Sequence, residues 1–343
     1  MALRLRLSRF AAAAAALIAI VIVAGPQAVA RDAVALPGAA TLRVVFLDVG
    51  QGDATLLMFP GRRAFLVDAG GLPATPLQDP TDGPAFDIGE RVVAPALRAF
   101  GVRALDTLVL THADSDHIGG AAAVLSRFRP RAVWEGVPVP RNEPLQWVQD
   151  AATAIGAEWR RVQVGDELLV GQVSLRVLHP PLPEWERQRV RNDDSVVLEV
   201  RFGNVSILLP GDAGKEAETR LLDHVESSRL TILKVPHHGS ATSSTSAFVE
   251  RLRPAAVIVS AGRNNRFGHP AKVVIDRYRS VGAEIFSTAQ DGAVVLDTDG
   301  VGVEMSTWTG RTMTFTNSLS TADANVKSAK LARNAKGGTG VEN

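Results

Sequence analysis

The chain has 343 residues, of which 46% are hydrophobic and 21% charged, and its formal net charge is +1. This is the composition of a globular protein with one large domain or two small ones. It excludes a nucleic-acid-binding protein that depends on a strongly basic surface, and the absence of cysteine excludes disulfides, thiolate metal ligands and a cysteine nucleophile.

The first 30 residues are predicted to be a secretory signal peptide. Three arginines precede an apolar run of 15 residues over 10–24, and the segment ends in a small-x-small tripeptide at 28–30. The run is shorter than the ~20 residues that a membrane-spanning helix needs. We therefore expect an exported protein, periplasmic or extracellular, with an uncleaved membrane anchor as the alternative. Without those three arginines the 37 basic residues become 34 against 36 acidic ones, a net charge of −2.

Three segments are expected after the signal peptide. Residues 31–41 are predicted to be a linker, residues 42–315 a folded domain, and residues 316–343, which are polar and poor in large apolar side chains, a disordered tail. No later apolar run approaches ~20 residues, so no stable membrane span is expected once the signal is cleaved. No pattern in the chain predicts an oligomeric state.

Within the domain, β-branched apolar runs alternate with stretches of helical spacing. Three strands in a meander are predicted over 41–71, a helix over 87–101 and a buried strand over 105–112. The clearest hairpin spans 193–214 and a last one spans 293–307, with helices and strands alternating between them. Strands in two groups, each followed by helices, predict an α/β domain in which two mixed sheets pack together with helices outside.

Four potential metal ligands lie at the end of the predicted buried strand and just after it, in the pattern H-x-D-x-D-H. They are His112, Asp114, Asp116 and His117. Side chains 112 and 114 can share one face of an extended segment, and residues 116 and 117 lie in the turn before the next helix. A single Asp or His here would be a helix cap or a solvated side chain. Four together predict ligands for two adjacent ions of zinc, manganese or iron.

Two later strand ends carry the same kinds of side chain. Asp212 follows an apolar strand in L-L-P-G-D; alone it would be a turn residue or a helix cap, but beside the first cluster it is predicted to be a bridging carboxylate. His237 and His238 end another strand in K-V-P-H-H-G-S, and one of them is a predicted ligand while the other orients substrate or acts as an acid or base. His269, in a loop rich in Asn, Arg and Gly, is a candidate for substrate binding or proton donation, or else an exposed loop residue.

These motifs, in this order, resemble the metallo-β-lactamase superfamily: H-x-D-x-D-H-x-G-G, then N-D-D-S before the hairpin into L-L-P-G-D, then V-P-H-H-G-S. The segments FLDVGQGDATLL, LVDAGG, FDIGERVVAPALRAFG and FGHP are most similar to the hydrolase domain of ComEC-type DNA-uptake competence proteins. The resemblance covers about residues 42–300. It implies an αββα sandwich of two mixed β-sheets with helices on the outer faces and a two-metal hydrolytic site at one edge of the sheets.

The resemblance also implies a ligand set. The usual superfamily motif is H-x-H-x-D-H, and Asp114 replaces the middle His, as in the competence-type domain. Asn192 stands where the superfamily has another His ligand, and His179 could replace it only if the loop folds back. One metal position is implied to hold His112, Asp114 and Asp212. The other is implied to hold Asp116, His117, Asp212 and His238, with His237 as the alternative to His238.

Two divalent metal ions, manganese or zinc, are therefore the expected cofactors. The first position is richer in oxygen ligands than in imidazole, which favours manganese there. A bound ion lowers the pKa of water toward ~7 and makes it a nucleophile at neutral pH. The expected catalytic residues are Asp116, His237 and His269, with the two histidines as alternative proton donors to the leaving oxygen.

The resemblance implies a phosphodiester substrate, with single-stranded DNA as the first candidate. Arginines at 187–191 and 263–266 flank Asn192 and His269 and are candidates to hold phosphates, or else solvated surface residues. The predicted substrate-binding residues are Asp48, Asp53, Asn192, Arg263 and Asn265. The two aspartates bracket a Gly-rich loop that lies near the metal edge in this family, unless the glycines serve only to turn one strand into the next.

The channel that accompanies this domain in competence proteins has no counterpart after the signal peptide, so a free-standing exported hydrolase is expected. The first hypothesis is a metal-dependent nuclease or phosphodiesterase that acts on DNA through a metal-activated water. One alternative is a hydrolase of a small ester, amide or lactone on the same scaffold. The other is a non-catalytic metal-binding module whose first metal position has decayed at Asn192.

Overall fold

The computed structural model describes residues 40–72, 86–182, 186–226, 228 and 230–316. The predicted signal peptide, nearly all of the linker and all but the first residue of the tail lie outside these residues, so those expectations stay predictions. Within the described ranges, no helix is both long and apolar enough to cross a membrane.

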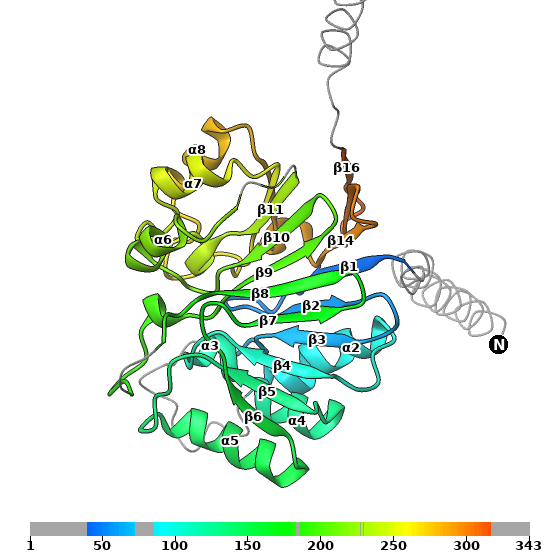
Figure 1. Ribbon diagram of the computed structural model, residues 1–343, viewed down its shortest axis with the longest axis vertical. Helices are drawn as coiled ribbons and strands as arrows, with labels where there is room; N and C mark the ends of the chain where they lie inside the picture. The colour runs from blue at the N-terminus through cyan, green and yellow to red at the C-terminus, as the bar shows by residue number, and fades with distance from the viewer. Residues whose placement is uncertain (1–39, 73–85, 183–185, 227, 229, 317–343) are drawn as a thin grey trace, which may run out of the picture.

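Two mixed β-sheets form the centre of the molecule (Figure 1). In the described residues the first sheet has nine strands, in the order β16-β15-β14-β1-β2-β3-β4-β5-β6. Their bounds are β1 (Leu42–Phe46), β2 (Thr55–Met58), β3 (Ala64–Val67), β4 (Thr107–Leu110), β5 (Ala132–Glu135), β6 (Glu158–Arg161), β14 (Val294–Thr298), β15 (Gly302–Thr307) and β16 (Thr312–Thr316). From β3 to β6 neighbouring strands are parallel, and the other pairs are antiparallel.

The second sheet, counted over the same part of the chain, has seven strands in the order β13-β12-β11-β10-β9-β8-β7. Their bounds are β7 (Glu167–Val170), β8 (Val173–His179), β9 (Val197–Phe202), β10 (Val205–Leu209), β11 (Leu230–Lys234), β12 (Ala256–Val259) and β13 (Glu284–Ser287). From β10 to β13 the strands are parallel, and from β7 to β10 they are antiparallel. Both sheets are therefore mixed, as expected.

Helices cover the outer face of each sheet (Figure 1). The first sheet is covered by η1 (Gly89–Val93), α2 (Ala94–Ala99), α4 (Ala121–Phe128) and α5 (Glu143–Ile155). The second is covered by α6 (Lys215–Leu221), α7 (Ser246–Leu252) and α8 (Lys272–Ser280). The short helices α3 (Ser115–Ile118), η2 (Asn192–Asp194), η3 (Pro236–Gly239) and α9 (Thr288–Asp291) lie in connecting loops. The four layers form the expected αββα sandwich.

The central strands are apolar on both faces because each face meets a different layer. In β1, Val44 and Phe46 point into the core between the sheets, whereas Val45 and the following Leu47 point into the core under the helices. Successive side chains of a strand alternate between faces, so a continuous apolar run marks a strand buried on both sides. The polar residues that follow such strands therefore gather at the sheet ends, outside either core.

Two features of the first sheet differ from the pattern expected. The predicted last hairpin exists as β14 and β15, but a further strand, β16, extends it. In addition, β14 pairs antiparallel with β1, so the two ends of the described chain lie side by side in one sheet. This pairing joins segments about 250 residues apart and leaves no local trace in the sequence.

Candidate metal centre

The polar side chains of the site come from both sheets and meet at one edge. From the first sheet, Asp53 precedes β2, Asp68 follows β3, and residues 112–117 follow β4. From the second sheet, Asp212 follows β10 and His238 follows β11. The cluster therefore lies across the junction of the two sheets.

The residues predicted for the second metal position are brought together. His117 Nε2 lies 3.3 Å from Asp212 Oδ1, and His238 Nε2 lies 3.4 Å from both Asp212 Oδ2 and Asp116 Oδ2. His117, Asp212 and His238 are all buried. His237 Nε2 lies farther from Asp212, at 3.8 Å, and its side chain is 25% exposed. The geometry therefore favours His238 over His237 as the ligand.

Several buried atoms of this cluster have no hydrogen-bond partner among the described residues. They are Asp53 Oδ1, His112 Nε2, His117 Nε2, Asp212 Oδ1 and His238 Nε2. A buried polar atom without a partner destabilises the folded state, so a group of them facing one another points to a missing shared partner. One ligand atom from each of Asp53, His117, Asp212 and His238 lies within 4.8 Å of the other three. Imidazole nitrogens and carboxylate oxygens are the ligands of zinc and manganese, so these residues fit a divalent ion.

The residues predicted for the first metal position are less enclosed. His112 Nε2 lies 3.3 Å from Asp114 Oδ2, and the ring of His112 is 4.1 Å from that of His117, centroid to centroid. The Asp114 side chain is 44% exposed. Within the described residues His112 makes no ion pair with Asp212. This position therefore offers fewer buried ligands than the second.

Asp53, expected to bind substrate, is instead buried inside the cluster. Its Oδ1 lies 3.5 Å from His238 Nδ1 and its Oδ2 lies 3.8 Å from His117 Nδ1. Both contacts are on the side of each ring opposite to the Nε2 atom that faces Asp212. Although Asp53 is close enough to be a metal ligand, these contacts indicate that it holds the two rings in place. A carboxylate that is 3% exposed does not reach a substrate at the surface.

Second partners fix the orientation of both ligand histidines. Asp68 Oδ2 lies 2.8 Å from His117 Nδ1 and accepts a hydrogen bond from Thr111 Oγ1, while Asp68 Oδ1 accepts one from Thr111 N. The Ser260 carbonyl oxygen lies 2.9 Å from His238 Nδ1. A proton on each Nδ1 donates to these acceptors, which leaves each Nε2 lone pair free for a metal ion. Sequence reasoning missed Asp68, whose signal was an Asp directly after the apolar strand β3, like His112 after β4.

Lys234, at the end of β11, was also missed. Its ammonium group is buried, forms an ion pair with Asp53 and lies 4.0 Å from Asp212 Oδ1 and 3.3 Å from the Gly211 carbonyl oxygen. Burial alone would lower the pKa of Lys234, but Asp53 and Asp212 hold it above its usual value. The lysine therefore stays charged and balances part of the carboxylate charge behind the ligands.

The charges of the cluster shift its pKa values in opposite directions. Burial alone would raise the pKa of Asp212, but His238 and His117 hold it well below its usual range. Burial alone would lower the pKa values of His117 and His238, yet Asp212 holds both well above the usual value. The carboxylates thus favour positive charge between them, which is what a divalent cation supplies.

His237 and His269, the predicted proton donors, are partly exposed and lie beside the buried cluster, and we refer to this exposed side as the mouth of the site. Asn192 Nδ2 lies 3.0 Å from His237 Nε2, and the rings of His237 and His269 are 5.7 Å apart. His237 and His238 have φ of 50° and 53°, a left-handed conformation that is uncommon outside glycine. Burial lowers the pKa of both His237 and His269, which favours their neutral form at pH 7.

The other predicted substrate-binding residues, Asp48, Arg263 and Asn265, differ in their hydrogen-bond partners. Asp48 is exposed and accepts a hydrogen bond from Gly50 N within its own loop. Arg263 donates to the carbonyl oxygen of Ala289, and the Asn265 amide is used up in hydrogen bonds of its own loop. Asn265 therefore shapes the loop that carries His269, and its side chain is not available to a substrate.

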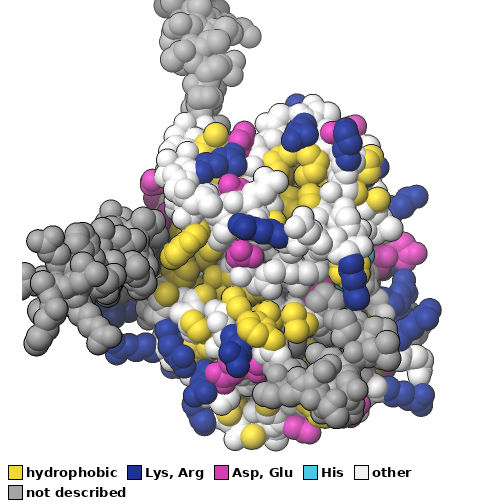
Figure 2. All heavy atoms as spheres, turned by 180° about the vertical axis from the view of Figure 1, so that it is seen from behind, with side chains coloured by type: hydrophobic (Ala, Val, Ile, Leu, Met, Phe, Trp, Pro, Cys, Tyr) yellow, Lys and Arg dark blue, Asp and Glu magenta, His cyan; other side chains and the backbone are white. Residues whose placement is uncertain are grey.

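The arginines beside Asn192 are paired with acidic residues. Arg187 lies 2.8 Å from Asp194, and Arg191 lies 3.0 Å from Glu216. On the face shown in Figure 2, Lys and Arg side chains are scattered among acidic and apolar ones and form no continuous basic surface.

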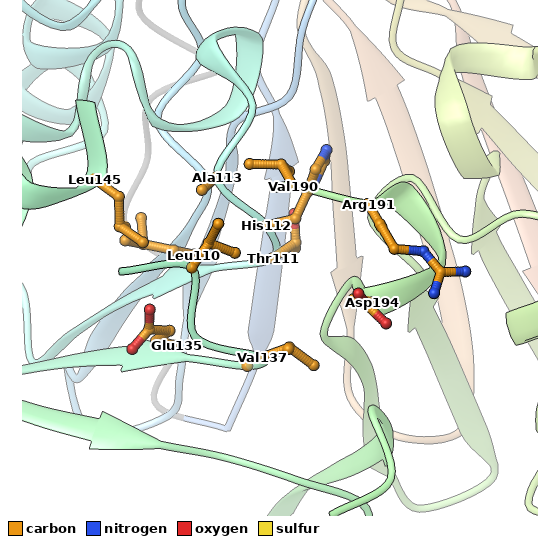
Figure 3. Close-up of a pocket in the computed structure, with 12 residues that line it drawn as sticks. Leu110, Thr111, His112, Ala113, Glu135, Val137, Leu145, Val190, Arg191 and Asp194 are labelled. Carbon is orange, nitrogen blue, oxygen red and sulfur yellow. The ribbon is translucent and has the colours of Figure 1, made fainter. Parts of the chain in front are cut away.

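A small cavity of about 20 Å³ lies beside His112 (Figure 3). Leu110 and Leu145 line one side of it, and Arg191 and Asp194 line the other. Glu135, also in its lining, accepts a hydrogen bond from Trp159 Nε1 at 2.7 Å, and burial raises its pKa. A cavity of this size holds on the order of one water molecule, so it is no substrate pocket in this form.

Comparisons with known proteins extend this description. A family model of the metallo-beta-lactamase superfamily matches residues 47–263. The chain is 34% identical over 261 residues to ComE operon protein 3 of Bacillus subtilis (strain 168), covering 73% of this chain and 32% of that protein. It is 29% identical over 252 residues to competence protein ComA of Neisseria gonorrhoeae, covering 73% of this chain and 31% of that protein.

The matches thus span about a third of the length of these relatives, both of them competence proteins of the expected type. Among solved structures, the metallo-beta-lactamase fold protein YhfI from Bacillus subtilis is 11% identical, with a TM-score of 0.45 over 72% of this chain and 96% of that one.

Proposed function

The chain belongs to the metallo-beta-lactamase superfamily, and we propose that it is a metal-dependent phosphodiesterase that cleaves DNA. The observation that carries this proposal is the convergence of unpartnered atoms from His117, His238 and Asp212 in one buried cluster. Asp116 completes the set, at 3.4 Å from His238. These four residues would hold one ion, and His112 with Asp114 would help to hold a second.

When bound, divalent ions supply a Lewis acid that lowers the pKa of a water molecule and offsets the negative charge of a phosphodiester. The chain itself supplies the positioning. Asp68 and Ser260 orient the ligand rings, and Asn192 orients His237 at the mouth. His237 or His269, after taking up a proton from solvent, would donate it to the leaving oxygen.

DNA is proposed as the substrate because one of the two relatives is a competence protein by name. The small net charge of the chain supports a substrate held by a few local contacts rather than by overall charge. A small ester, amide or lactone substrate remains the alternative on this scaffold, and no residue of the mouth favours it.

The proposal is tested by hydrolysis assays with the purified protein after metal removal. Manganese or zinc is added back with single-stranded DNA, bis-p-nitrophenyl phosphate or a lactone. We expect both phosphodiesters to be cleaved and Asp116→Asn to lose this activity, whereas Asp276→Asn, an exposed residue of α8, keeps it. Cleavage of the lactone alone would contradict the phosphodiester proposal and favour the alternative hydrolase. Metal binding without any hydrolysis would favour a non-catalytic binding module.

We also propose that the protein is exported and that its signal peptide is removed. The mature chain would then begin at Arg31. Mass spectrometry of the protein recovered from the periplasm or the medium tests this, and a chain that retains its first 30 residues in the membrane fraction would contradict it.

A further inference from the structure

Three aromatic rings lead from the metal cluster to the protein surface. The ring of His238 lies 6.4 Å from that of His269 with an angle of 25° between the planes, and the ring of His269 lies 5.7 Å from that of Phe267 at 24°. Exposure rises along this series, from 2% at His238 to 46% at Phe267. Phe267 therefore presents a flat apolar surface to solvent, one ring away from a metal ligand.

The loop holds Phe267 in this exposed position. Asn265 Oδ1 accepts hydrogen bonds from Phe267 N and His269 N, while Asn265 Nδ2 donates to the carbonyl oxygens of Gly262 and His269. Ala271 N then donates to the carbonyl oxygen of Gly239, which ties the loop to the turn that carries His238. Single exposed apolar side chains are common on protein surfaces. What sets Phe267 apart is its stacking on His269, the ring next to the candidate ligand His238.

We propose that Phe267 is a stacking platform for a nucleobase next to the phosphate that is cleaved. This inference rests on the proposed function and narrows its substrate to nucleic acid with unpaired bases. A base in a duplex is covered on both faces by its neighbours, whereas a base in a single strand has a free face that stacks on an aromatic ring whatever its identity.

Arg266 adds a positive charge beside the platform. Its guanidinium carbon lies 4.9 Å from the centroid of the Phe267 ring, and the side chain is exposed. The guanidinium lies over the ring, so a base that stacks on Phe267 would displace it from this face, where it can contact a phosphate of the strand. The neighbouring groups therefore match the two alternating parts of a single strand, a flat base and an anionic backbone.

The test compares two oligonucleotides in binding experiments with the metal-loaded protein, using phosphorothioate strands that resist cleavage. One is an ordinary single strand, and the other has the same length but lacks its bases. Phe267→Leu removes the flat ring but keeps an apolar side chain, and Phe267→Trp restores a ring. Trp147→Leu, at an exposed aromatic residue on α5, is the control.

We expect Phe267→Leu to weaken binding of the base-bearing strand on the order of 5- to 100-fold and to leave the abasic strand unchanged. Phe267→Trp and Trp147→Leu are expected to bind both strands like the unmodified protein. Equal binding of the base-bearing strand by the Leu variant, or an equal loss for both strands, would overturn the platform. If the platform is overturned but bis-p-nitrophenyl phosphate is still hydrolysed with metal, the proposed phosphodiesterase function is retained. If no phosphodiester is hydrolysed, both the phosphodiesterase function and the platform are contradicted.

Discussion

Asp68 controls which nitrogen of His117 faces the cluster, because it holds the opposite nitrogen and two donors of Thr111 at once. We expect Asp68→Asn to weaken metal affinity about 10- to 100-fold, since an amide cannot accept from all three donors. Titration calorimetry measures the change. Asp106→Asn is the matched control, because Asp106 also accepts a backbone hydrogen bond, from Ala64, at the far end of the same strands. Similar losses in both variants would contradict the positioning role.

Lys234 and Asp53 form a buried ion pair whose members depend on each other. Lys234→Met leaves the Asp53 carboxylate buried without this partner, so we expect the free energy of unfolding to fall by about 3–5 kcal/mol in chelator. Urea denaturation measures it. The double variant with Asp53→Asn removes the stranded charge and is expected to recover part of the loss. If the double variant is no more stable than Lys234→Met, the unpaired Asp53 charge is not the cause of the lower free energy of unfolding.

His179 makes stability depend on pH. It is buried, its Nδ1 lies 2.9 Å from the Ser195 carbonyl oxygen, and burial lowers its pKa from the ordinary 6.5. As the pH falls below about 6.5 the unfolded chain takes up a proton that the folded protein does not, so the free energy of unfolding decreases. Urea denaturation at about pH 7.5 and pH 5.5 is expected to show a smaller decrease for His179→Asn than for the unmodified protein. Parallel decreases would exclude His179 as a source.

The sequence predicts the candidate ligands, but it does not predict the residues that hold them in place. His112, Asp116 and His117 form a dense local pattern after an apolar strand, and Asp212 and His238 follow two more such strands. By contrast, the partners of Asp68 and Lys234 lie 49 and 181 residues away, at His117 and Asp53. Only the folded chain brings these pairs together, which is why Asp53 was placed near the substrate instead of behind the ligands.

At the scale of the elements, the turn between β1 and β2 presses against the loop that carries Asp116. A Cβ atom on Gly52, which has φ of +135°, would lie 2.3 Å from the Asp116 carbonyl oxygen. We expect Gly52→Ala to lower the free energy of unfolding by about 1–3 kcal/mol and to weaken metal binding, because the loop must move. Gly61→Ala, at φ of +86° with no atom within 4 Å, carries the backbone strain without the clash. If Gly52→Ala and Gly61→Ala bind metal with equal affinity, the contact between this turn and the Asp116 loop does not affect metal binding.

The strands themselves follow from composition, since runs such as residues 44–47 are apolar on both faces and fit a sheet covered on both sides. Their order does not follow. The pairing of β14 with β1 and the addition of β16 depend on backbone hydrogen bonds between distant segments, which side-chain patterns do not specify.

For the molecule as a whole, a bound metal ion ties the two sheets together, because its ligands belong to both. Free metal at about 100 times its Kd is expected to stabilise the folded state by ~2.7 kcal/mol. Thermal unfolding after chelation, with and without added manganese or zinc, measures the effect. Asp116→Asn is expected to show a smaller rise in Tm, and Asp276→Asn the same rise as the unmodified protein. If neither manganese nor zinc changes the Tm of the unmodified protein, the proposed metal centre is contradicted.

The division of the ligands between the sheets also decides where the protein acquires its metal. His117 belongs to the first half of the chain and His238 to the second, so an unfinished or unfolded chain carries only fragments of the site. Loading would then be a late event that takes place where folding is completed. Under the proposed export, that place is the compartment outside the membrane. The supply of ions there, rather than the order of metal affinities, would then select the metal that the protein binds.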